Sequence, residues 1–70
     1  MANKYFWTTD ETEKIKASKI QSLKICNQVF LGELFYIVIP VIGNKEHNKA
    51  IANNFNTKEE AVAWINKNFK

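Results

Sequence analysis

The spacing of apolar positions predicts a helix near the end of the chain. Between residues 58 and 69, apolar side chains recur every three or four positions and form one stripe. Thr57 precedes this stripe as a helix N-cap, and Glu60, three residues after Thr57, completes a capping box. The residues expected to form the buried stripe are Ala61, Val62, Ile65 and Phe69, with Trp64 on its margin.

Two segments before this helix are typical of a β-hairpin. Residues 34–39 are β-branched, aromatic or leucine throughout, and this run is too short for a helix. A polar turn opens at Gly43 and runs to about His47, after which the alternation over residues 49–55 suits a return strand. Because Pro40 cannot donate to a ladder, the first strand ends there, bulges there or turns its amide side outward.

Residues 9–31 fit two patterns, of which the alternating one fits better. Most odd positions from 15 to 31 are apolar and most even positions are polar, which favours strands. Thr8 and Glu11 have the spacing of a capping box, so a helix that starts there is the alternative. We expect strands, and one more short strand over residues 3–8.

These elements predict an α+β fold in a single domain, 1–70. We expect a small antiparallel sheet of three to four strands with the C-terminal helix packed on one face. One helix covers only one face of such a sheet. Because residues 34–39 are apolar on both faces of a strand, the second face has to contact a partner protein, a second copy of the chain, or a helix formed by residues 9–31.

The aromatic residues predict where a partner binds. Two Trp, two Tyr and five Phe are more than a thin core needs. In a short N-terminal strand, Tyr5 and Trp7 share one face, and Tyr36 is the expected anchor because interfaces favour a large ring with one polar end. The expected partner-binding residues are Tyr5, Trp7, Leu34, Tyr36 and Val38.

Composition excludes several classes of protein. Hydrophobic residues make up 46% of the chain and charged residues 24%, which is typical of a globular protein. One Cys and one His are too few for an internal disulfide or a zinc site. The most apolar run, residues 34–42, is much shorter than the roughly 20 residues of a membrane-spanning helix. We expect a soluble, cytoplasmic protein without a membrane contact.

The residues that could carry chemistry do not form a catalytic pattern, so we expect neither an enzyme, nor a cofactor, nor a bound metal. His47 lies in a polar turn without a nucleophile beside it and is interpreted as a solvated turn residue. Cys26 is interpreted as a small buried hydrophobe. Asp10, Glu11 and Glu13 lack the spacing of a calcium loop and are interpreted as a turn or a helix start.

The basic residues are ten lysines without an arginine, and the net charge is +3. Lysine offers phosphate only a point charge, so a nucleic-acid contact would be weak, directed at the backbone and sensitive to salt. The candidates for such a contact are Lys16, Lys24, Lys49 and Lys58. A chain rich in Lys, Asn and Ile and without Arg is typical of an AT-rich genome, as in low-GC bacteria and their phages.

The end of the chain resembles a known DNA-binding domain. Phe55, Thr57, Lys58, Glu60, Ala61 and Trp64 follow the pattern Phe-x-Thr-Lys-x-Glu-Ala-x-x-Trp. Over residues 55–69 the chain resembles the arm-site DNA-binding domain of phage-type tyrosine recombinases. The resemblance implies a three-stranded antiparallel sheet that enters the major groove, with a helix at the C-terminal end. The strands of that family are rich in Arg and Lys, whereas residues 34–42 carry no charge.

Taken together, the residues predict a non-catalytic binding module that acts by protein–protein contact. Small accessory proteins of phages and mobile elements have this character, among them inhibitors of a host nuclease and anti-CRISPR proteins that block a defence complex. The alternative function is a DNA-binding module of the recombinase-arm type.

Overall fold

The computed structural model describes residues 4–69, which form two antiparallel sheets and one α-helix. The elements are β1 (Tyr5–Trp7), β2 (Lys14–Lys16), the short 3-10 helix η1 (Ala17–Lys19), β3 (Ser22–Phe30), β4 (Glu33–Ile42), β5 (Lys45–Glu46), β6 (Ala52–Phe55) and α1 (Lys58–Asn68). β1 pairs with β2, while β3, β5 and β6 all pair with β4. This confirms the expected α+β fold, although the strands divide between two sheets.

The segment over residues 9–31 forms strands, as its alternation predicts. β2 and β3 both lie in this segment. Thr8 does not start a helix, because its side chain closes the loop between β1 and β2. The Thr8 hydroxyl donates to the Asp10 carboxylate at 2.6 Å and accepts the backbone N–H of Glu13 at 3.2 Å.

β4 is the central strand of the larger sheet. β3 pairs along one side of it, and β5 and β6 pair with different parts of its other side. The expected return strand over residues 49–55 is shorter, because the chain between β5 and β6 runs outside the regular ladder. Two backbone N–H groups of this connection still bind β4, from His47 to the Pro40 carbonyl and from Ile51 to the Val38 carbonyl, each at 2.9 Å.

α1 begins at the residue that the sequence predicts. The hydroxyl of Thr57 accepts the backbone N–H of Glu60 at 3.2 Å, which confirms the N-cap. The Glu60 carboxylate accepts the N–H of Asn56 at 2.9 Å and not that of Thr57, so the reciprocal half of the capping box is shifted by one residue. Glu59 and Glu60 also place negative charge in the first turn, where the helix dipole favours it.

An aromatic cluster joins the C-terminal end of α1 to β1. Phe6 stacks on Phe69 with ring centroids 4.5 Å apart. Trp64 contacts both rings, at centroid distances of 5.9 Å and 6.0 Å. Lys4 adds to the same contact, because its ammonium donates to the Asn68 carbonyl at 2.9 Å and lies 5.2 Å from the centroid of the Phe6 ring.

The buried face of α1 differs from the expected stripe at one position. Ala61 is fully buried, and Trp64, Ile65 and Phe69 pack against the core, whereas Val62 is 40% exposed. Successive residues of a helix are about 100° apart, so a buried face that includes Trp64 turns Val62 toward solvent. The sequence placed Trp64 on the margin because its aromatic partner on β1, Phe6, is distant in the chain.

α1 covers the face of the larger sheet that carries Val38. Val38 is fully buried and Tyr36 packs against the same core, so these alternate residues of β4 point toward the helix. Phe35, Ile37 and Ile39 therefore point to the opposite face, which α1 does not cover. Tyr36 and Val38, two of the residues expected to bind a partner, therefore lie on the face that α1 covers, and not on the second face, which was expected to meet the partner. A strand that is apolar on both faces carries no signal for the face that the helix takes.

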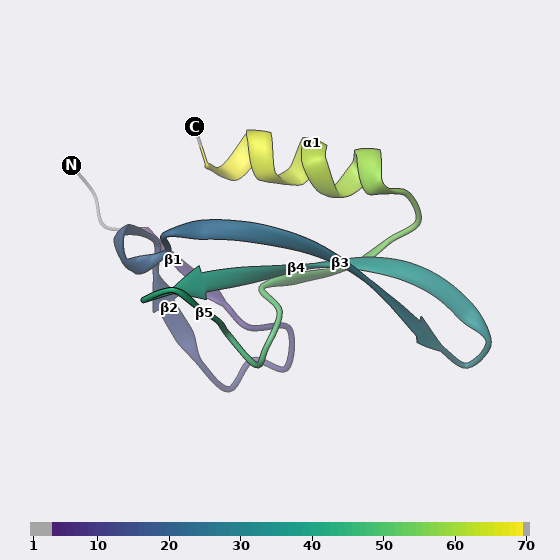
Figure 1. Cartoon of the computed structure of the whole chain (residues 1–70), viewed down its shortest axis with the longest axis horizontal. Helices are drawn as coiled ribbons and strands as arrows, with labels where there is room; N and C mark the ends of the chain where they lie inside the picture. Colours follow the sequence, from purple (N-terminus) through teal and green to yellow (C-terminus); the bar gives the residue numbers. More distant parts are fainter. Residues whose placement is uncertain (1–3, 70) are drawn as a thin grey trace.

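The molecule is elongated, with extents of 41 × 22 × 22 Å. α1 runs along the long axis over β3 and β4, and its C-terminal end lies near β1 and β2 (Figure 1). At the other end of the long axis, the β3–β4 hairpin extends beyond the first turn of α1 (Figure 1). The turn of this hairpin and the aromatic cluster therefore lie at opposite ends of the molecule.

Candidate binding surfaces

The projecting end of the β3–β4 hairpin carries four exposed apolar side chains, which we call the hairpin tip. They are Val29 (68% exposed), Phe30 (63%), Leu31 (85%) and Leu34 (52%). Val29 and Leu34 are cross-strand partners and share one face, whereas Phe30 pairs with Glu33 on the other face. Single exposed apolar residues are common, but four of them gathered at one hairpin end, on both of its faces, are typical of a contact surface.

The hairpin turn places a leucine where glycine or asparagine is favoured. Leu31 and Gly32 form a two-residue turn with φ values of 54° and 77°, as a type I′ turn requires. The β4–β5 hairpin has Gly43 and Asn44 at the equivalent positions, with φ values of 59° and 67°. The left-handed conformation costs a residue with a Cβ roughly 1–2 kcal/mol. Leu31 therefore combines backbone strain with almost complete exposure.

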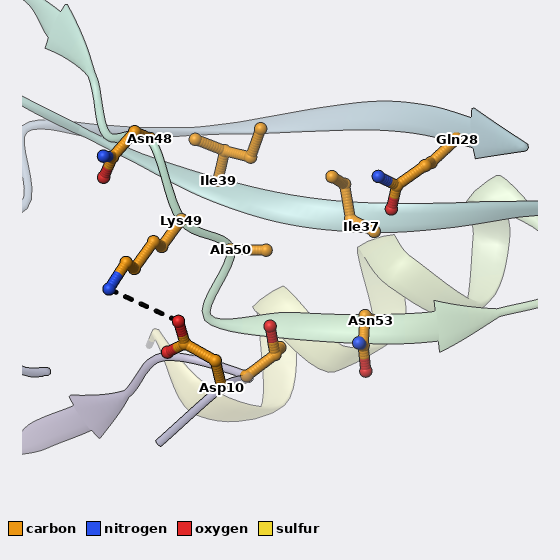
Figure 2. A pocket seen from close by; sticks show the side chains of 9 residues that line it. Asp10, Gln28, Ile37, Ile39, Asn48, Lys49, Ala50 and Asn53 are labelled. Carbon is orange, nitrogen blue, oxygen red and sulfur yellow. Dashed lines mark ion pairs between the residues drawn. The ribbon is translucent and has the colours of Figure 1, made fainter. Parts of the chain in front are cut away.

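A shallow cleft of about 250 Å³ lies on the face of the sheet that α1 does not cover. Ile37 and Ile39 of β4, together with Ala50, supply its apolar part, and Gln28 and Asn53 also line it (Figure 2). The connection that carries Lys49 crosses the cleft, and polar side chains line this part of it (Figure 2). The cleft can accept a small apolar group with polar edges.

A network of charged groups at this cleft joins two loops. The Lys49 ammonium donates to the Thr12 hydroxyl at 2.6 Å and lies 3.3 Å from the carboxylates of Asp10 (Figure 2) and Glu13. In the neutral ring, Nδ1 of His47 accepts the backbone N–H of Lys49 at 3.0 Å, so Nε2 carries the proton and donates to Glu13 at 3.2 Å. The network holds the β1–β2 loop against the β5–β6 connection.

These contacts shift two pKa values in the network. Hydrogen bonds from the Thr8 hydroxyl, and then from Thr12, hold the pKa of Asp10 well below its ordinary range. Glu13, and then Asp10, raise the pKa of Lys49 above its ordinary value. The imidazole of His47 is 18% exposed, so this residue is a partly buried structural partner and not the solvated turn residue that the sequence suggests.

The outer face of the β1–β2 sheet carries two aromatic rings and two lysines, which we call the aromatic–lysine face. Its residues are Tyr5, Trp7, Lys14 and Lys16, since the register pairs Tyr5 with Lys16 and Trp7 with Lys14. Tyr5 is 44% exposed and Trp7 is 55% exposed. The Lys14 ammonium lies 4.9 Å from the ring centroid of Tyr5 and 5.8 Å from that of Trp7. Tyr5 and Trp7 thus share a face, as the sequence predicts.

The five residues expected to bind a partner lie in three different places. Tyr5 and Trp7 lie on the aromatic–lysine face, and Leu34 belongs to the hairpin tip. Tyr36 is half-buried against the core and Val38 is fully buried within it. The structure therefore does not bring these residues together into one surface.

Three residues of the hairpin tip, Val29, Phe30 and Leu31, were not identified from the sequence. Leu31-Gly32 lies between two segments of strand-like composition, which is a signal for a two-residue hairpin loop. Identifying that loop would have placed the apolar residues beside it at an exposed end.

The four lysines expected to contact nucleic acid also lie apart. Lys24 forms an ion pair with Glu46 at 2.6 Å, and this contact raises the pKa of Lys24. Lys49 is held in the network with Asp10 and Glu13. Lys16 lies on the aromatic–lysine face, and Lys58 begins α1 toward the other end of the molecule (Figure 1).

The remaining residues that could carry chemistry are Cys26 and the possible metal ligands. Cys26 is a free, partly buried thiol opposite Ile37. Among residues 4–69, no group of three or more His, Cys, Asp and Glu side chains is arranged to hold a metal ion. In the same part of the chain, no helix has the length and apolar character needed to cross a lipid bilayer.

Comparison with known proteins gives no match for this chain, whether with protein-family models, curated proteins or solved structures. The resemblance of residues 55–69 to a recombinase arm-site domain therefore stays a prediction from the sequence. The function has to be argued from the surfaces described above.

Proposed function

We propose that this chain is a non-catalytic binding module that acts by protein–protein contact through the hairpin tip. The observation that carries the proposal is Leu31, which is 85% exposed and has a φ of 54°. A leucine at this position adds strain and buries little apolar area, so folding alone gives no reason for a leucine there. Strained residues cluster at functional contacts, where the strain serves something other than stability.

The shape and chemistry of the hairpin tip favour an apolar recess on a partner protein. The hairpin projects from one end of the molecule, so a second copy of the same convex surface would not enclose it (Figure 1). Glu33 is the one charged residue between residues 27 and 35, and its negative charge opposes contact with an anionic lipid surface. Fully burying a side chain such as Leu31 or Phe30 is worth roughly 1.5–3 kcal/mol, which is enough for both to act as anchors.

The test uses Leu31→Asn, which removes the apolar side chain and relieves the turn. Asparagine adopts the left-handed conformation more readily than leucine, so the variant should be at least as stable as the parent in urea. A photo-crosslinking residue in place of Glu33 captures the partner from nuclease-treated extracts of the source cells. We expect Leu31→Asn to weaken capture about tenfold or more, from the roughly 1.5–3 kcal/mol that burial of leucine contributes.

Val62→Gln is the matched control, because Val62 is an exposed apolar residue on α1 and not in the hairpin tip. Its capture of the partner should equal that of the parent. Added salt should change capture little, whereas a contact between lysines and DNA phosphates weakens with a log–log slope of about −0.9 per phosphate. Undiminished capture by Leu31→Asn, or an equal loss in Val62→Gln, would contradict the proposal.

The alternative, a DNA-binding module of the recombinase-arm type, has less support. β4 carries one charge, on Glu33 at its start, and that charge is negative. Lys24 and Lys49, two of the four candidate lysines, are already paired with carboxylates.

A further inference from the structure

We infer that the aromatic–lysine face is a binding site for a single-stranded polynucleotide. The inference uses residues of the β1–β2 sheet only and does not rest on the proposed contact at the hairpin tip. It differs from the recombinase-arm alternative, in which a sheet enters the groove of a duplex.

The two aromatic rings provide a fixed surface for unpaired bases. Tyr5 and Trp7 are two residues apart in β1, which separates their Cα atoms by about 6.6 Å and directs both rings to the same side. Phe6 between them is 8% exposed and stacks on Phe69, so β1 is anchored with both rings facing outward. Exposed aromatic residues at alternate positions of a strand can each stack one splayed base, which a duplex does not offer.

The lysines place positive charge where the phosphates of a stacked strand would pass. The Lys14 ammonium lies over both rings, 4.9 Å from the Tyr5 centroid and 5.8 Å from the Trp7 centroid. Lys14, Lys16 and Lys19 make no ion pair with a carboxylate within residues 4–69. These three lysines also line a hollow of about 340 Å³ that adjoins Tyr5.

The carboxylate that lines the same hollow does not neutralise these lysines. Glu13 is bound instead to His47 at 3.2 Å and to Lys49 at 3.3 Å. Aromatic faces combined with unpaired lysines are the combination that binds single strands without sequence preference. The charges around this hollow therefore favour a polyanion whose bases can stack, and the carboxylate beside Trp7 is that of Glu11, which lines a separate hollow.

The test measures fluorescence anisotropy of labelled short oligothymidylate and oligouridylate with the purified chain, over a series of salt concentrations. We expect a log–log salt slope of about −2, since each phosphate neutralised on a single strand contributes about −0.7. Trp7→Ala and Tyr5→Ala should each weaken binding by about 5- to 150-fold, the effect of losing one stacked base. Trp7→Phe, which keeps a ring, should restore most of the affinity. Binding of either oligonucleotide supports the inference, and the tighter one identifies DNA or RNA as the strand.

Charge variants separate this site from general attraction to a basic protein. Lys14→Gln should reduce the magnitude of the salt slope by about 0.7, the contribution of one phosphate on a single strand. Lys58→Gln removes the same charge at the start of α1 and should leave the slope unchanged. Urea unfolding of every variant confirms that the folded chain is compared. Equal binding by Trp7→Ala, an equal effect of Lys58→Gln, or binding to vesicles of anionic lipid without binding to oligonucleotides would overturn the inference.

Discussion

The stack of Phe6 on Phe69 docks the β1–β2 sheet onto the end of α1, and a double-mutant cycle can measure it. Phe6 is 8% exposed, and the two rings are 4.5 Å apart and within 12° of parallel. Truncation of a buried phenylalanine to alanine costs about 3–5 kcal/mol. A chain of 70 residues has a stability of about 4–10 kcal/mol, so two alanine substitutions would unfold it.

Leucine substitutions keep the chain folded while they remove the contact between the rings. Phe6→Leu and Phe69→Leu keep an apolar side chain and much of the volume, so each should cost less than the roughly 3–5 kcal/mol of truncation to alanine. A stacked aromatic pair contributes about 0.5–1.5 kcal/mol beyond burial of its area. The double variant should therefore be less destabilised than the sum of the single variants by that amount.

Urea unfolding followed by circular dichroism supplies the four free energies of unfolding for the cycle. The control cycle combines Phe6→Leu with Leu31→Asn, because Leu31 lies in the hairpin turn at the opposite end of the molecule. Its two effects should add to within about 0.3–0.5 kcal/mol. A coupling energy this small for Phe6 and Phe69 would refute the docking of α1 onto β1.

Two further predictions concern local contacts. Thr57→Ala should lower the free energy of unfolding by about 1 kcal/mol, because the N–H of Glu60 loses its acceptor; an unchanged urea midpoint would show that the cap does not stabilise α1. The pKa of Asp10 is lowered in the folded chain, so its contribution to stability is present above about pH 4 and is lost as pH falls through its lowered pKa. Thermal midpoints should accordingly fall more steeply on acidification below about pH 4 in the parent than in Asp10→Asn, and parallel pH profiles would contradict this assignment.

The elements with local signals could be predicted from the sequence. Thr57 and Glu60 determine the start of α1 within a single turn, so short-range spacing is enough to locate it. The alternation over residues 9–31 likewise predicts strands, because side chains on successive strand residues point to opposite faces.

The features that could not be predicted from the sequence depend on contacts between segments that are distant in the chain. Val38 and Ile37 are equally apolar, and their burial differs because α1 packs over Val38 and not over Ile37. Trp64 is partly buried because it packs against Phe6, which is 58 positions away in the chain. The candidate sites differ in the same way. The shared face of Tyr5 and Trp7 could be predicted from their spacing in one strand, whereas the exposure of Leu31 could be predicted only by recognising the hairpin turn.

The aromatic cluster and the hairpin turn also differ in the number of residues that lie between the two positions that each brings together. The β3–β4 turn closes over two residues, whereas the contact between Phe6 and Phe69 closes over the 62 residues between them. The entropy of loop closure rises by about 0.6 kcal/mol for each doubling of length, which makes the second contact costlier by about 3 kcal/mol. We expect the hairpin to form early in folding and the docking of α1 onto β1 to complete it. A partner that binds the hairpin tip would thus contact the part of the chain that we expect to form first.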